Sequence, residues 1–146
     1  MRNSFLIRLC NQLSLPLFIL CLAQFAFVGG TLAAGGKVFF VEPKNNSKVA
    51  SPFKVKMGVS GMKVCPAGKE TPDKQCGHHH IIVDGSVVPS GDIVPLDGTH
   101  LHFGKEQTEA ELTLSKGKHT LTLQFGDYAH KSFGKDLSAT INIEVQ

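Results

Sequence analysis

Apolar and polar residues alternate along most of the chain after residue 35, with the two-residue period that is typical of β-strands. No stretch of that part shows a sustained 3.6-residue apolar period, so we expect no long helix there. The alternation predicts short strands at residues 37–41, 53–59, 78–83, 101–103, 110–114, 121–125 and 141–145. Seven or so strands over about 110 residues, separated by turns rich in Gly, Pro, Asn and Asp, predict an all-β fold, an immunoglobulin-like antiparallel β-sandwich.

Two of the connecting segments have recognisable turn chemistry. Asp84 and Gly85 follow the strand at residues 78–83, and Asp-Gly is a strong signal for a two-residue hairpin. Residues 115–118, which read Ser-Lys-Gly-Lys, predict a tight turn between two long strands.

The N-terminal segment follows a different pattern. A basic start with Arg2 and Arg8 precedes an apolar run at residues 13–28, and small residues follow it around Ala33 and Ala34. This is the plan of a secretory signal peptide. An uncleaved membrane anchor is the alternative, because the run approaches the ~20 residues that a spanning helix needs, but a proline and a glutamine interrupt it.

We therefore expect a signal peptide at residues 1–34, followed by a single domain at residues 35–146 that is periplasmic or secreted and has no further membrane contact. Removing Arg2 and Arg8 from the 15 basic residues leaves 13, all lysine, against 12 acidic residues. Because clustered arginine and lysine supply most of the affinity for nucleic acids, this near-neutral domain is not expected to bind them.

The cysteines of the expected domain are Cys65 and Cys76, which flank a polar loop containing proline and glycine. In an oxidising compartment such a pair is expected to form a disulfide. Closing a loop of this length contributes roughly 3 kcal/mol in the chain-entropy model. Two soft metal ligands are the alternative, although the spacing matches no tight cysteine motif.

The candidate chemistry lies in the seven histidines, five of which form two clusters. In a strand, residues i and i+2 share a face about 6.6–7 Å apart, so His78 pairs with His80, and His100 pairs with His102. Leu101 is a natural core residue, which turns both histidines of the second pair away from the core. If the pairs lie on neighbouring strands, up to four imidazoles converge, which suits a tetrahedral zinc site or three ligands with an open position; copper(II) would also accept them.

Each cluster also has a structural interpretation. A triple histidine can form an exposed polar strand end, and a His-X-His pair can be a hydrogen-bonded arrangement without a ligand. The orientation of the first cluster is ambiguous, because Ile81, Ile82 and Val83 are apolar in both phases of the strand. The strand pattern does not decide the role of His79.

The two remaining histidines are more isolated. His119 is in phase with apolar strand residues after a glycine turn, so we expect a hydrogen-bonded histidine at the edge of the core. His130 follows an expected inter-strand loop from which a ligand could be presented. Asp127, three residues earlier, could orient a histidine, but we expect it to cap the turn.

These motifs occur together at residues 65–68, 77–85, 100–109 and 117–127, with His130 beyond them. Over residues 38–145 the chain resembles the secreted bacterial family called domain of unknown function 4399. The resemblance implies a periplasmic β-sandwich in which both clusters, His119 and His130 belong to the family pattern, and it implies no activity. The chain departs from that pattern in having Cys65 and Cys76 bracket a loop, which suggests a local staple, and in having Glu106 where glycine is expected.

Two functions follow from these features. The first is a metal-binding module that holds zinc or copper through His78, His80, His100 and His102, with His130 as a further ligand. The second is a non-catalytic, immunoglobulin-like interaction module of the cell envelope, whose histidines rigidify loops and whose protein or polysaccharide partner the sequence does not identify. An enzyme is less expected, because no nucleophile elbow, paired-carboxylate motif or phosphate loop is present and no catalytic residue can be named.

Overall fold

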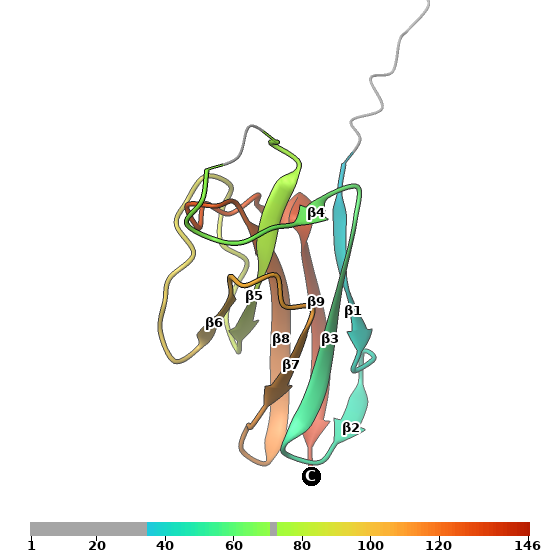
Figure 1. The fold of residues 1–146 in the computed structure, drawn as a ribbon. Coiled ribbons are helices and arrows are strands. Elements are labelled where there is room, and N and C mark those ends of the chain that lie inside the picture. The colour runs from blue at the N-terminus through green and yellow to red at the C-terminus, as the bar shows by residue number, and fades with distance from the viewer. Residues whose placement is uncertain (1–34, 71–72) are drawn as a thin grey trace, which may run out of the picture. The chain divides into compact units, whose positions relative to one another are not determined.

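The structure is a computed structural model that describes residues 35–70 and 73–146, so the expected signal peptide lies outside the described residues. Almost all regular structure in these ranges is β (Figure 1), as the alternation of apolar residues predicts. The described residues form nine strands: β1 (Lys37–Glu42), β2 (Ser47–Val49), β3 (Phe53–Ser60), β4 (Lys63–Val64), β5 (Cys76–Val83), β6 (His100–Phe103), β7 (Glu109–Leu112), β8 (Gly117–Gly126) and β9 (Ser138–Val145). One short 3₁₀ turn, Lys135–Leu137, precedes β9. No helix in the described part of the chain is long and apolar enough to cross a membrane.

The strands form two sheets. One has the order β1-β3-β7, and the other has the order β2-β9-β8-β5-β4, with β6 paired to β5. Most neighbours are antiparallel, but β2 runs parallel to β9 and β4 runs parallel to β5. The expectation of a wholly antiparallel arrangement is therefore wrong at β2 and β4, which are too short to show a hydrophobic period in the sequence.

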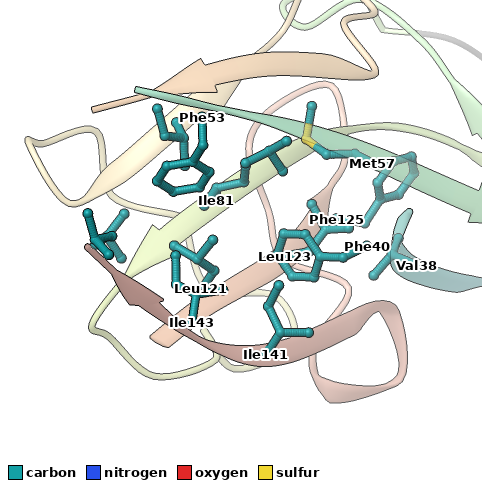
Figure 2. Close-up of a cluster of buried hydrophobic side chains, with 14 of the residues drawn as sticks. Val38, Phe40, Phe53, Met57, Ile81, Leu121, Leu123, Phe125, Ile141 and Ile143 are labelled. Atoms are coloured by element: carbon teal, nitrogen blue, oxygen red, sulfur yellow. The ribbon is translucent and has the colours of Figure 1, made fainter. Parts of the chain in front are cut away.

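Both sheets contribute side chains to one hydrophobic core (Figure 2). In β3 the alternation is direct, because Phe53, Val55 and Met57 are buried while Lys54 is exposed. These side chains meet those of the larger sheet, where Leu123 is fully buried. The even spacing of apolar residues thus locates the core correctly.

Strand β5 is buried on both faces, which explains the unbroken apolar run at residues 81–83. Ile81 belongs to the main core, whereas Ile82 packs with Val88 and Val94 in a second, smaller cluster. Both valines come from residues 84–99, the long connection between β5 and β6. This connection covers the outer face of β5, so the strand lacks the polar alternation of a half-exposed strand.

Two expected turns have different roles. Asp84 does not start a tight hairpin: its N–H donates to the Thr120 carbonyl, its Oδ1 accepts from the Thr120 N–H at 2.7 Å, and the chain continues for residues 84–99 before β6. Residues 115–118 do not join two paired strands either. Residues 113–116 connect β7 of the three-stranded sheet to β8 of the larger sheet, and residues 117 and 118 already belong to β8. Local turn chemistry does not specify which sheet the next strand joins.

Candidate metal centre

The register of β5 against its neighbours places the first histidine cluster on two faces. His79 lies opposite Phe103 of β6 and Phe125 of β8, whereas His80 lies opposite His102 and Gln124. Directly opposed residues share a face of a sheet, and Phe125 belongs to the main core. His80 and His102 therefore share the face away from that core, and His78, two residues before His80, shares it as well.

A turn supplies the fourth histidine. His130 adopts a positive φ of 65° within residues 127–131. The carboxylate of Asp127 accepts hydrogen bonds from the backbone N–H groups of Ala129 at 2.8 Å and Lys131 at 2.9 Å, and the Asp127 carbonyl accepts from the His130 N–H at 2.9 Å. Asp127 thus caps the turn, as expected, and the turn holds His130 beside the strand histidines.

Four imidazoles converge at this point: those of His78, His80, His102 and His130. One ring nitrogen from each lies within 4.8 Å of those from the other three. The ring centroids of His78 and His80 are 4.7 Å apart, as are those of His102 and His130. The Nε2 atoms of His102 and His130 are 3.1 Å apart, within hydrogen-bond distance. The group has the number and kind of ligand atoms that a zinc or copper ion requires.

The four histidines differ in exposure. His78 and His80 are fully buried, His130 is half-buried and His102 is exposed. Both ring nitrogens of His78 and of His80 have no hydrogen-bond partner among the described residues. Burying a polar group without a partner costs about 1–3 kcal/mol. The inner half of the site therefore presents unsatisfied nitrogens to its centre.

Burial also controls the protonation of the inner histidines. Desolvation, with the positive charges of neighbouring histidines, lowers the pKa of His78 to about 4 and that of His80 to about 3. Partial burial and the charge of His130 lower the pKa of His102. These three imidazoles are therefore neutral near pH 7, which is the form that binds a metal.

The structure does not bring His100 into this group. Its Nδ1 donates to Oδ1 of Asp97 at 2.8 Å, and the same oxygen accepts the backbone N–H groups of Thr99 and His100. His100 thus stabilises the loop before β6, although it shares a face of the strand with His102.

Two further histidines also lie outside the group. His79 packs against Phe125, with a distance of 5.0 Å between ring centroids, on the core side of β5. His119 is hydrogen-bonded at both nitrogens, to the Asp84 carboxylate at 2.7 Å and to the Ser115 carbonyl at 3.0 Å. The expectation that His119 is a hydrogen-bonded histidine is confirmed.

Cys65 and Cys76 form the expected disulfide, with a Cα–Cα distance of 5.7 Å. Neither sulfur is therefore a thiol ligand, and the alternative of a soft cysteine site is wrong. The bridge links the segment after β4 to the first residue of β5, two positions before His78.

Sequence reasoning underestimated one residue, His130. A ligand in a turn has no periodicity, so the turn-forming residues around Asp127 were its one local signal. His130 lies close to His102 because the 127–131 turn and strand β6, which are distant in the sequence, meet in the folded chain.

The family model described as domain of unknown function (DUF4399) matches residues 55–146, a range that contains all four converging histidines and both cysteines. No curated protein and no solved structure matches the chain.

Proposed function

Because the chain belongs to the family described as domain of unknown function (DUF4399), which brings no activity with it, we propose a function from the site: the protein binds one zinc or copper ion through His78, His80, His102 and His130. The observation that carries this proposal is the convergence of four imidazole nitrogens within 4.8 Å. His100 is not part of the proposed ligand set, because Asp97 already engages its ring.

The unsatisfied nitrogens favour a metal over a purely structural role. A structural histidine cluster would pair its ring nitrogens with one another or with the backbone. Here the His102–His130 contact is such a pair, but His78 and His80 have no partner among the described residues. His79 on the other face of β5 has none either, so the convergence of His78 and His80 with two further imidazoles is what distinguishes them. A bound ion would give one ring nitrogen of each inner histidine a partner.

The ligand chemistry limits the choice of ion. The group consists of neutral nitrogen ligands, which suit zinc and copper, whereas calcium and magnesium prefer oxygen. Divalent copper binds a given nitrogen site more tightly than zinc, so supply in the compartment decides which ion is held.

The proposal includes the setting of the site. We infer that residues 35–146 form an exported immunoglobulin-like β-sandwich, preceded by a cleaved signal peptide at residues 1–34. Two sheets around one core and the Cys65–Cys76 disulfide support this inference, since structural disulfides persist in oxidising compartments such as the periplasm.

A direct titration tests the function. Untagged protein recovered from the periplasm, stripped with a chelator and dialysed at pH 7.5, is titrated with Zn²⁺ and, separately, with Cu²⁺ by calorimetry. We expect about one equivalent of either ion to bind with a Kd well below ~10 µM. If neither ion binds more tightly than ~10 µM, the metal function is wrong, and a non-catalytic interaction module becomes the better explanation.

A further inference from the structure

A short segment after β4, residues 65–68, makes backbone hydrogen bonds to all three parts of the chain that carry the four histidines. The Cys65 N–H donates to the Gly77 carbonyl at 2.7 Å, next to His78. The Ala67 N–H donates to the Gly104 carbonyl at 2.9 Å, two residues after His102. We call residues 65–68 the strap.

The third contact reaches the turn that carries His130. The Gly68 N–H donates to the Tyr128 carbonyl at 2.8 Å. Gly68 has a positive φ of 78°, which lets the chain direct its N–H toward this turn. The strap therefore connects β5, the end of β6 and the 127–131 turn through three donors within four residues.

The disulfide attaches the strap to the rigid side of the site. Cys65, the first strap residue, is bonded to Cys76 at the start of β5. Strand β5 is held by β8 on one side and by β4 and β6 on the other, so His78 and His80 have positions set by the sheet. The disulfide thus ties the strap to the strand that carries His78 and His80.

The other two ligands depend more on local contacts. His102 lies in a four-residue edge strand, β6, which pairs with β5 alone among the described strands, and His130 lies in a turn. The strap also packs close to His102: a Cβ at Gly104 would overlap the His102 ring and lie 2.7 Å from the Ala67 methyl carbon. Positions of edge strands and turns are defined less strongly than those of central strands.

We propose that the disulfide-anchored strap is a positioning element of the metal site, which holds His102 and His130 at the spacing from His78 and His80 that one ion requires. This inference rests on the proposed metal function. Preorganised ligands bind more tightly because less conformational freedom is lost on binding, and groups that orient metal ligands typically contribute 10–100-fold to affinity.

Two changes to the strap test the inference. Gly68→Ala places a Cβ on a residue with positive φ, a backbone conformation that alanine rarely adopts. The added methyl group would meet no atom within 4 Å, so the change acts on the Gly68–Tyr128 hydrogen bond through the backbone and not through a steric clash. Cys65→Ala combined with Cys76→Ala removes the anchor. We expect either change to weaken Zn²⁺ binding about 10–100-fold and to alter the visible absorption spectrum of bound Co²⁺, which reports ligand geometry.

Gly117→Ala is the matched control. Gly117 also has a positive φ, 134°, and open space where a side chain would project, but it begins β8 opposite Val145, whereas the other end of β8 lies beside His78. Its φ is even less suitable for alanine, so the control should destabilise the metal-free domain at least as much as Gly68→Ala does, while retaining wild-type Zn²⁺ affinity and Co²⁺ spectrum.

The outcomes separate the inference from the function. If wild type binds no metal, the proposed function fails. If wild type binds metal and both strap changes leave affinity and spectrum unchanged, the positioning role is overturned while the metal function stands. Equal loss of affinity in Gly68→Ala and Gly117→Ala would also overturn the positioning role, since general destabilisation would then account for the effect. If the cysteine variant does not fold, the comparison of Gly68→Ala with Gly117→Ala still decides the question.

Discussion

The Nε2 atom of His102 lies 3.1 Å from the Nε2 atom of His130, although 28 residues separate them in the chain and one belongs to a strand and the other to a turn. Two nitrogens on a tetrahedral zinc ion with bonds of about 2.0–2.1 Å would be about 3.3–3.4 Å apart. In the metal-free protein one of these nitrogens donates a hydrogen bond to the other. A bound ion would replace that proton at nearly the same separation.

The first prediction separates two histidines on the same strand. His102→Ala removes a proposed ligand, whereas His100→Ala removes a ring that is bonded to Asp97. We expect His102→Ala to weaken Zn²⁺ binding by at least about 100-fold, or about 2.8 kcal/mol, and His100→Ala to leave it within about threefold, measured by competition with a chromophoric chelator. Equal losses in the two variants would contradict the ligand set.

The second prediction concerns the free energy of unfolding of the metal-free protein, which the unpaired ring of His80 lowers. His80 is fully buried with both ring nitrogens unpaired, so His80→Leu should stabilise the metal-free protein by about 1–3 kcal/mol in urea unfolding while abolishing metal binding. His119→Leu is the contrasting variant, because His119 is hydrogen-bonded at both nitrogens and its loss should destabilise the domain. A destabilised His80→Leu protein would argue that His80 has a structural role.

The third prediction is the pH dependence of the metal-free protein. Burial lowers the pKa of His78 and His79 to about 4 and that of His80 to about 3, whereas in the unfolded chain each titrates near 6.5. Below pH 6.5 the unfolded state therefore binds more protons, and stability falls as pH falls toward 4. Each histidine contributes a slope of at most about 1.4 kcal/mol per pH unit.

Urea unfolding between pH 7 and 4.5 measures this slope directly. His79→Leu provides the control, because it removes one buried histidine that is not among the proposed ligands. The variant should lose about a third of the slope and retain Zn²⁺ affinity. A flat stability profile in wild type would show that the buried histidines do not titrate as their burial requires.

The fourth prediction concerns the Asp84–His119 pair. The hydrogen bond from His119 to the Asp84 carboxylate raises the pKa of His119. Burial tends to raise the pKa of Asp84, but hydrogen bonds from Thr120 and His119 outweigh it and the net shift is downward. Asp84→Asn should therefore lower the His119 pKa, seen by NMR titration of its ring protons, and should leave metal binding unchanged.

The sign of the accompanying stability change follows from the same pair. A raised His119 pKa contributes stability that is fully present below pH 6.5 and is lost as pH rises through the folded-state pKa. The lowered Asp84 pKa contributes stability above about pH 4 that is lost as pH falls through its folded-state value. The stability difference between wild type and Asp84→Asn should therefore be largest between these limits, and a difference that grows above pH 7 would contradict the assignment.

The fifth prediction tests the close approach at Gly104. A methyl group there would overlap the His102 ring, so Gly104→Ala should displace His102 and weaken Zn²⁺ binding by about 10-fold or more. Gly98→Ala is the control, because a Cβ at Gly98 meets no atom within 4 Å. Calorimetric titration of both variants measures the difference, and similar affinities would show that the His102 ring can shift without cost to the site.

Much of the fold could be predicted without the structure, and all four histidines of the candidate site were among the five expected ligands, of which His100 is the one outside the group. The two-residue period located the main strands, and it indicated that His78 and His80 share a face, because that relation is a property of one strand. Leu101 packs against the core, as predicted, and so does Phe103, which turns His102 outward. The short strands β2 and β4 and the partners of the turns at residues 84–85 and 115–118 could not be predicted, because few local contacts specify them.

Local sequence was enough to define an almost entirely β domain with a disulfide and with histidines paired in strand phase, since these features depend on the alternation and chemistry of nearby residues. Which histidines meet depended instead on how the strands and loops pack. The β5–β6 register places His102 opposite His80. A hydrogen bond to Asp97 holds the His100 ring at the loop before β6, and the 127–131 turn positions His130 beside His102. Each of these arrangements rests on contacts or turn geometry that a local two-residue period does not encode.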